Sequence, residues 1–292
     1  MGSMSRDRPM KKPKWIRRKL PSGPEYEAVR SMLKEGKLHT VCQEAQCPNI
    51  WECFSCGTAT FLILGSRCTR NCRFCAVEQG PLGAPDPEEP KRVADAAERM
   101  GLQYIVVTSV TRDDLPDGGA TQFAETICEI RRRIPDARVE VLIPDFQGNA
   151  EALGTVLDAG PDVLNHNMET VSRLYDTVRP QADYQRSLNL LRTSLELAPT
   201  LPTKSGIMLG LGERNGEIRE VLSDLRAAGC QMLTLGQYLQ PTRDHFPVER
   251  YVDPEEFDQW REAALRMGFS EVSSGPLVRS SYHAQDLFGE VR

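Results

Sequence analysis

Residues 68–75 read Cys68-Thr69-Arg70-Asn71-Cys72-Arg73-Phe74-Cys75 and follow an apolar run at residues 59–64. The three cysteines are separated by three and then by two residues. Three thiolates in so short a span can hold three irons of a cubic [4Fe–4S] cluster and leave the fourth iron without a protein ligand. The apolar run is typical of a buried strand. We therefore expect the site on the loop after that strand, where catalytic groups gather in α/β barrels.

A structural zinc site is the alternative interpretation of this triplet. Zinc commonly takes four ligands in a closed site, often as two C-x2-C pairs. A lone triplet with a three-residue and then a two-residue gap fits that pattern poorly. The spacing therefore favours an iron–sulfur cluster.

A second triplet, Cys42, Cys47 and Cys53, has the spacing C-x4-C-x5-C and ends fifteen residues before Cys68. Taken alone this is a weak motif. The start of the chain has no apolar leader segment, so we expect a cytoplasmic protein with reduced thiols rather than disulfides. The clustered, reduced cysteines therefore predict bound metal.

Three of the nine cysteines lie outside the triplets. Cys56 comes three residues after Cys53 and is an alternative ligand; the family resemblance described below implies that it is not used. Cys128 and Cys230 lie in helical or helix-end stretches, where we expect them to pack in the core.

The C-x3-C-x2-C run resembles the signature of the radical SAM enzymes. The upstream triplet and the C-terminal Arg279-Ser280-Ser281-Tyr282 are similar to the lipoyl synthases of that superfamily, and the likeness runs from Lys14 to Tyr282. It implies two [4Fe–4S] clusters and S-adenosylmethionine (SAM). The ligand set that it implies for the SAM-binding cluster is Cys68, Cys72 and Cys75. For the auxiliary cluster it is Cys42, Cys47, Cys53 and a serine, Ser281 with Ser280 as the alternative.

Polar residues at the ends of later strands resemble the family's SAM pocket. The candidate cofactor-binding residues are Thr108, Ser109, Asn165, Glu169, Arg179, Gln237 and Tyr238. Arg179 has an equal alternative role as a helix cap. His166, next to Asn165, is more simply interpreted as a buried structural histidine than as a catalytic residue. The glycines of Lys204–Glu213 permit close approach of the backbone to a ligand, since they lack Cβ.

Apolar runs alternate with helical patterns after residue 58, which predicts a parallel sheet with right-handed crossovers. The fold class is α/β, and the resemblance implies a partial (β/α)6 TIM-like barrel. We expect an N-terminal extension at 1–57, the barrel at 58–268, and a C-terminal segment at 269–292 that returns a serine to the auxiliary cluster. The expected strands are Ala59–Leu64, Tyr104–Val110, Val139–Pro144, Val163–Asn167, Ser205–Leu211 and Met232–Leu239. The expected helices are Glu88–Met100, Thr121–Arg133, Asp183–Leu197, Gly216–Ala228 and Pro254–Met267.

The resemblance implies a sulfurtransferase. It would insert sulfur at C6 and C8 of a protein-bound octanoyl-lysine, with sulfur donated by the auxiliary cluster, and give the lipoyl cofactor. The implied partners are an octanoylated lipoyl carrier domain or glycine cleavage H protein, an electron donor such as ferredoxin or flavodoxin, and an iron–sulfur carrier. The alternatives are another radical SAM enzyme with an auxiliary cluster and a non-enzymatic electron carrier. A ferredoxin-like carrier needs four cysteines per cluster and no barrel.

Composition sets the remaining bounds. The 292 residues carry a formal net charge of −5, so we expect no nucleic-acid partner, and no apolar run is long enough to predict a membrane span. Eight Lys and Arg residues lie between positions 6 and 20, against Asp7. This basic arm is either a solvated tail or a docking element for an acidic partner. We see no sign of an obligate oligomer and expect a monomer.

Overall fold

The computed structural model describes residues 11–17, 23–56, 58–80 and 83–289. Six parallel strands form the body of its main sheet, and each overlaps a strand expected from the sequence. All six expectations are confirmed to within two residues at either end. The strands are β2 (Thr60–Ile63), β5 (Tyr104–Ser109), β6 (Arg138–Leu142), β7 (Val163–Asn165), β8 (Thr203–Leu209) and β9 (Met232–Gln237).

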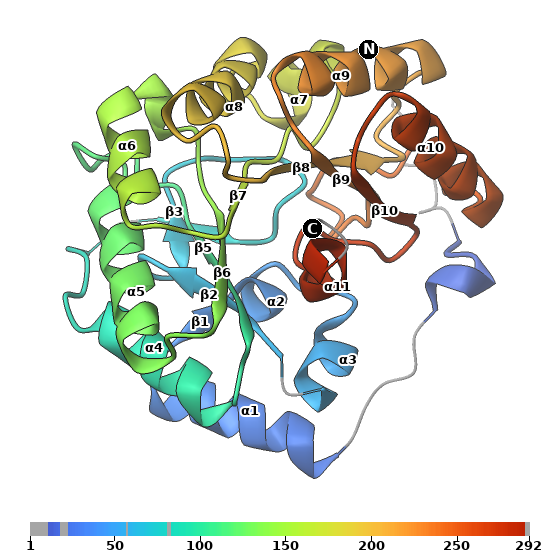
Figure 1. The fold of residues 1–292 in the computed structure, drawn as a ribbon. Helices are drawn as coiled ribbons and strands as arrows, with labels where there is room; N and C mark the ends of the chain where they lie inside the picture. Colours follow the sequence, from blue (N-terminus) through green and yellow to red (C-terminus); the bar gives the residue numbers. More distant parts are fainter. Residues whose placement is uncertain (1–10, 18–22, 57, 81–82, 290–292) are drawn as a thin grey trace.

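Two further strands occupy the edges of this sheet. β10 (Glu271–Gly275) pairs in parallel with β9, and β1 (His39–Thr40) pairs antiparallel with β2. The strand order is β1-β2-β5-β6-β7-β8-β9-β10, and no pairing between β1 and β10 closes the ring among the described residues. The C-terminal helix α11 (Ala284–Gly289) contacts both β10 and β5, so it spans the opening (Figure 1). The expected partial barrel is confirmed.

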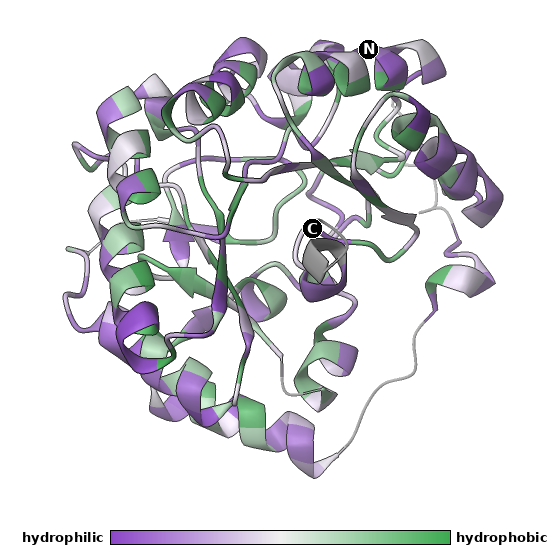
Figure 2. Cartoon of the chain, in the orientation of Figure 1, coloured by the Kyte–Doolittle hydropathy of each residue, from purple (hydrophilic) through white to green (hydrophobic). Residues whose placement is uncertain are grey.

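The crossover helices lie on the outside of the curved sheet (Figure 1). Figure 2 shows that the strands and the inward-facing sides of the helices carry most of the hydrophobic residues, as the buried core requires. Asp183 and Asp253 cap two helices by accepting hydrogen bonds from backbone N–H groups of the first turn. The five expected helices are observed as α4 (Glu89–Arg99), α5 (Ala120–Arg133), α8 (Tyr184–Leu197), α9 (Asn215–Ala227) and α10 (Pro254–Arg266).

Several short elements were not expected from the sequence. Asn149 caps α6 (Ala150–Asp158) through hydrogen bonds from two backbone N–H groups. The others on the barrel are the helices α7 (Tyr175–Val178), η2 (Phe146–Gly148) and η3 (Ser172–Leu174), and the small sheet of β3 (Arg67–Cys68) and β4 (Glu78–Gln79).

The N-terminal extension is helical and packs through aromatic side chains. It contains η1 (Lys14–Ile16), α1 (Pro24–Glu35), α2 (Val41–Glu44) and α3 (Ile50–Ser55). The ring of Tyr26 on α1 lies 4.9 Å from that of Trp51 and 5.5 Å from that of Phe54, both on α3. This contact fixes α3, which carries Cys53, against the rest of the extension.

The two cysteines outside the clustered region have different surroundings. Cys230 is fully buried, as expected, but Cys128 is exposed, so the prediction that it packs in the core is wrong. The buried stripe of α5 runs through Phe123, Ile127 and Ile130. Cys128 follows Ile127 and is rotated away from that stripe by the helical period.

No helix in the described ranges is long and apolar enough to cross a membrane.

Candidate metal centres

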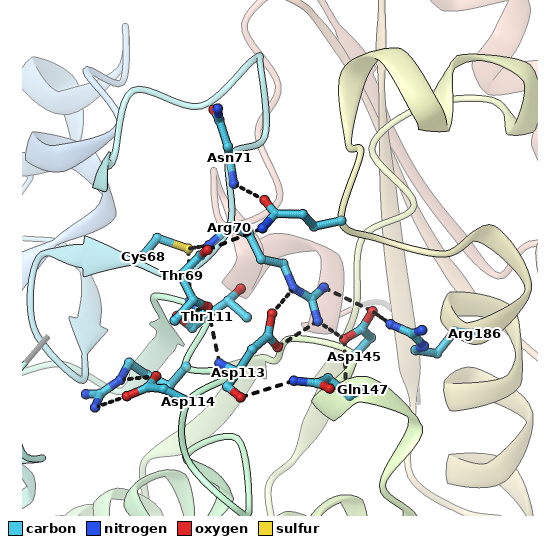
Figure 3. A network of polar contacts seen from close by, with 12 residues as sticks. Cys68, Thr69, Arg70, Asn71, Thr111, Asp113, Asp114, Asp145, Gln147 and Arg186 are labelled. Atoms are coloured by element: carbon cyan, nitrogen blue, oxygen red, sulfur yellow. Dashed lines mark hydrogen bonds and ion pairs between the residues drawn. The ribbon is translucent and has the colours of Figure 1, made fainter. Parts of the chain in front are cut away.

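The loop that carries Cys68, Cys72 and Cys75 follows β2, as expected, and Arg70 fastens it to the barrel. Figure 3 shows the guanidinium of Arg70 lying between two carboxylates at the ends of β5 and β6. Its Nε donates to Asp113 at 2.6 Å and its Nη1 donates to Asp145 at 3.0 Å. Arg70 is only 6% exposed, so these ion pairs compensate the burial of its charge.

The same network holds Asp145 in its charged form. Burial alone would raise the pKa of Asp145, but the hydrogen bonds and charge of Arg70 lower it to about 2. Arg186 adds a second, longer contact to Asp145 at 3.4 Å. These ion pairs hold the loop between Cys68 and Cys72 against the segments that follow β5 and β6. Arg70, Asp113 and Asp145 were not among the residues expected at the site, because their role depends on ion pairs between distant parts of the chain.

The three thiols of this loop influence one another. Burial, together with the neighbouring Cys72 and Cys68, raises the pKa of Cys75 to about 12. Burial also raises the pKa of Cys72, which Arg179 opposes. Two backbone N–H groups, of Arg70 and Thr111, point at Cys68 Sγ from 3.4 and 3.3 Å. These buried thiols therefore stay protonated on their own, and losing their protons requires a bound positive charge, which iron would supply on taking thiolate ligands.

The upstream triplet lines a different cavity. Cys42, Cys47 and Cys53 share about 220 Å³ of space with Thr60 and Ser281. Burial, together with the neighbouring thiols of the triplet, raises the pKa of Cys42 to about 11 and that of Cys53 to about 12. The amide and hydroxyl of Thr60 oppose the shift at Cys42 by hydrogen bonding. This cavity offers three thiols, as the loop after β2 does, together with the hydroxyls of Thr60 and Ser281.

A C-terminal arm, Leu277–Tyr282, brings the hydroxyl of Ser281 to the cavity. Two contacts fasten the arm to the N-terminal extension beside the cysteines. Asn49 Nδ2 donates to the carbonyl of Leu277 at 2.7 Å, and the hydroxyl of Tyr282 donates to Glu52 at 2.7 Å. Residues about 230 positions apart in the sequence are thus joined. This explains why a cluster motif near one end of the chain is paired with a motif near the other.

The two serines of the arm face different sites. Ser281 lines the cavity of the triplet, and its Oγ accepts a hydrogen bond from Thr60 at 2.8 Å. Ser280 is not part of the cavity lining, and its Oγ accepts a hydrogen bond from Asn167 Nδ2 at 2.7 Å. This division favours Ser281 over Ser280 as the ligand for the auxiliary cluster.

Two glycines of the barrel make room for the arm. A Cβ on Gly206 would lie 2.4 Å from Thr234 Oγ1 and 3.3 Å from Ser280 Oγ, and one on Gly236 would lie 2.2 Å from the carbonyl oxygen of Val278. Gly206 was expected to permit close approach of a ligand. Its small size also serves the packing of the protein against its own C-terminal segment.

Buried polar atoms with no protein partner among the described residues lie at or just after the ends of β5 and β7 and at the end of α7. They are Ser109 Oγ, Asn165 Oδ1, His166 Nε2, Asn167 Oδ1 and Arg179 Nε. Unpaired buried groups are costly and call for a polar ligand or water. Ser109, Asn165 and Arg179 are among the expected SAM contacts. The residues present therefore fit a polar cofactor at the mouth of the barrel.

Glu169 and Arg179 both contact Asn167, which follows the end of β7. Glu169 has φ of 65°, a left-handed conformation that is uncommon for a residue with a side chain and clusters at functional sites. Its carboxylate accepts a hydrogen bond from Asn167 Nδ2 at 3.1 Å. Arg179 Nη1 donates to the carbonyls of Asn167 and Met168, both at 3.1 Å. The guanidinium thus braces the chain just before Glu169.

Three other expected SAM contacts have their polar groups engaged within the protein. Gln237 is fully buried, and its amide nitrogen donates to three backbone carbonyls while its oxygen accepts from Val252 N. The hydroxyl of Tyr238 donates to Phe246 O at 2.6 Å, and that of Thr108 donates to Leu142 O at 2.9 Å. These side chains brace the barrel mouth, and their contact with SAM stays a prediction.

A buried ion pair crosses the barrel wall and was not expected. Lys204 and Glu140 are both 0% exposed, with Lys204 Nζ 3.0 and 3.1 Å from the two carboxylate oxygens of Glu140. Tyr104 and Asn165 also donate to that carboxylate, at 2.7 and 2.9 Å. The network joins β5, β6, β7 and β8. Through Tyr104 it reaches the cavity of the upstream triplet.

Neither triplet is arranged as a zinc site. Over the residues that the structure covers, no three His, Cys, Asp or Glu side chains converge as a single ion requires. A cubic cluster differs because each thiolate binds a separate iron at a separate corner.

Comparison with known proteins agrees with this reading. Residues 62–225 match the model of the radical SAM superfamily, and residues 3–47 match that of the N-terminal domain of lipoyl synthase. The lipoyl synthase of Desulfotalea psychrophila is 59% identical over 277 residues, which cover 95% of this chain and 93% of that protein. The chain belongs to the lipoyl synthase family. Members of this family are radical SAM sulfurtransferases, and SAM and [4Fe–4S] clusters are their cofactors.

A second relative and the solved structures complete the comparison. The lipoyl synthase of Caldanaerobacter subterraneus subsp. tengcongensis is 57% identical over 275 residues, 94% of this chain and 96% of that protein. The crystal structure of methylornithine synthase (PylB) matches with a TM-score of 0.53 at 14% identity, over 88% of this chain and 84% of that one. Streptococcus suis SuiB bound to S-adenosylmethionine matches with a TM-score of 0.56 at 10% identity, over 70% and 46%. These structures share the fold.

Proposed function

We propose that this lipoyl synthase family member inserts sulfur at C6 and C8 of an octanoyl chain carried on a lysine of a protein. The sulfur comes from an auxiliary [4Fe–4S] cluster held by Cys42, Cys47, Cys53 and Ser281. The second cluster, held by Cys68, Cys72 and Cys75, binds SAM. When bound, SAM and its cluster supply the abstraction of hydrogen from unactivated C–H bonds.

One observation carries this proposal. The C-terminal arm delivers Ser281 into the cavity of the three N-terminal cysteines, where Thr60 holds its hydroxyl at 2.8 Å. A hydroxyl is a poor ligand for iron beside three thiolates, which are softer. A cluster with one weak ligand suits a site that must be dismantled to give up its sulfur.

The chain's own residues supply binding and orientation. Arg70 fixes the loop of the SAM cluster through its two carboxylate partners. Arg179 fixes the backbone before Glu169, and the unpaired groups of Ser109 and Asn165 are offered to SAM.

The proposed partners follow from the same reaction. The substrate is an octanoylated lipoyl carrier domain or the glycine cleavage H protein, a ferredoxin or flavodoxin supplies electrons, and an iron–sulfur carrier rebuilds the spent cluster. The enzyme acts as a monomer in the cytoplasm.

The basic arm steers docking of an acidic carrier. Its residues Lys11, Lys12, Lys14 and Arg17 belong to the described chain, whereas Arg6, Arg8, Arg18 and Lys19 lie outside it. Deleting residues 6–19 is expected to weaken carrier binding at low salt, and unchanged binding contradicts the steering role.

A single-turnover assay tests the proposed function. Reconstituted protein, SAM, a reductant and an octanoyl-lysyl peptide are incubated without oxygen or added sulfide, and the peptide is followed by mass spectrometry. We expect the peptide to gain two sulfurs and lose hydrogens. Ser281→Ala is expected to cleave SAM without completing the product, and Ser270→Ala, a serine at the start of β10, is the matched control. Cleavage of SAM with an unchanged peptide in the wild type would overturn the substrate assignment.

A further inference from the structure

Thr60 occupies an unusual place between two candidate ligands. It is the first residue of β2, is 5% exposed, and its hydroxyl donates to Ser281 Oγ at 2.8 Å. It lines the same cavity as Cys42. We propose that Thr60 is a positioning residue that holds Ser281 Oγ toward the upstream triplet and thereby sets how long the serine-ligated iron is retained. This inference rests on the proposed role of Ser281.

The side chain of Ser281 needs such a partner. The arm is fastened by Asn49 to the carbonyl of Leu277 and by the hydroxyl of Tyr282 to Glu52. Both contacts fix the course of the arm, but neither selects the rotamer of Ser281, which has three staggered wells. The hydrogen bond from Thr60 selects the well that directs the oxygen into the cavity.

Thr60 is itself held rigidly. β2 lies inside the sheet, between β1 on one side and β5 on the other, and Thr60 is in register with Val106 of β5. A β-branched side chain at this position has little rotamer freedom. A weak ligand on a C-terminal arm is therefore aimed by a donor on the fixed wall of the barrel.

The test removes the hydroxyl while keeping the shape of the side chain. Thr60→Val deletes the donor at nearly constant volume, and Thr60→Ser restores it. Thr126→Val is the matched control, because Thr126 is also fully buried and donates to a backbone carbonyl, Gln122 O, on the outer helix α5. Each full-length protein is reconstituted without oxygen and challenged with a ferrous chelator in the absence of substrate. Release of the first iron is followed by absorbance and by electron paramagnetic resonance.

Thr60→Val is expected to release this iron about three- to tenfold faster than the wild type, because the loss of one hydrogen bond changes a rate by about this factor. Thr60→Ser and Thr126→Val are expected to match the wild type. Repeating the challenge with Cys68, Cys72 and Cys75 all replaced by alanine assigns the released iron to the upstream triplet. If valine prevents folding, Thr60→Ala makes the same deletion.

A double-mutant comparison separates this inference from the function beneath it. If Thr60 acts through Ser281, Thr60→Val adds nothing to the rate in a Ser281→Ala background. Equal release from wild type and Thr60→Val, with fast release from Ser281→Ala, overturns the role of Thr60 and leaves the ligand set intact. Equal release from all three overturns Ser281 as a ligand, and the role of Thr60 falls with it.

Discussion

Substitution of Gly236 by alanine tests how closely the C-terminal arm must pack for the auxiliary site to form. The added Cβ would lie 2.2 Å from the carbonyl oxygen of Val278, whereas real Cβ contacts essentially never fall under 3.0 Å. The arm must therefore retreat by at least about 0.8 Å, the difference between these two distances. The nearest atom is backbone, so no side-chain rotation relieves the contact.

Ser281 follows Val278 by three residues, so this shift is transmitted to the ligand. A misplacement of about 1 Å can cost on the order of a hundredfold in a catalytic step. We expect Gly236→Ala to lose iron from the upstream triplet and to form the product at about one hundredth of the wild-type rate, while SAM cleavage changes much less.

The assay measures iron per chain, SAM cleavage and sulfur insertion in the same preparation. Gly154→Ala is the matched control, because a Cβ at Gly154 on α6 meets nothing within 4 Å. That variant is expected to behave as the wild type and to gain up to about 1 kcal/mol of stability from the better helix former. A Gly236→Ala protein with full iron content and full sulfur insertion would refute the close packing of the arm as a requirement.

Three further predictions follow from the contacts described. Lys204→Met leaves the buried carboxylate of Glu140 with only neutral donors; it is expected to destabilise the protein by about 3 kcal/mol and to lower its melting temperature by about 6 °C in a thermal scan. The pKa of Asp145 is about 2 beside Arg70, below the value of about 3.9 in the unfolded chain. Asp145 therefore contributes about 2.5 kcal/mol to the free energy of unfolding above pH 4, and this contribution is lost as the pH falls toward 2. Asp145→Asn is expected to reduce the drop in melting temperature between pH 4 and pH 2. Cys56→Ala is expected to keep the iron content of the wild type by chemical analysis, because Cys56 is exposed and lies outside the cluster spacing; loss of iron would make it a ligand.

The barrel strands were predictable because a run buried on both faces leaves a continuous apolar signature. The edge strand β10 was not, because Glu271–Gly275 is only partly buried and reads Glu-Val-Ser-Ser-Gly, a polar stretch. The prediction that Cys128 is buried was wrong because it ignored where this residue lies on its helix. An apolar residue in a helical pattern was assigned to the core, although the period of α5 turns it outward.

The candidate site divides in the same way. Cysteine spacing is local, so both triplets were visible in the sequence. The choice between Ser280 and Ser281 depends on which way each hydroxyl points. That direction follows from long-range contacts, of Thr60 with Ser281 and of Asn167 with Ser280, which the sequence does not show. Pairings such as Arg70 with Asp145 join residues 75 positions apart. Gln237 was a candidate because it ends a strand, but its hydrogen bonds lie within the protein, and no local pattern shows how an amide is satisfied.

The origin of the inserted sulfur tests the central claim most directly. The protein is reconstituted with heavy-isotope sulfide and then incubated without oxygen with SAM, a reductant, an octanoyl-lysyl peptide and excess sulfide of ordinary isotope. We predict that both inserted sulfurs carry the heavy isotope and that product stops at one lipoyl group per chain. Product that contains ordinary sulfur, or that accumulates beyond one group per chain without a cluster supply, would contradict the auxiliary site as the donor.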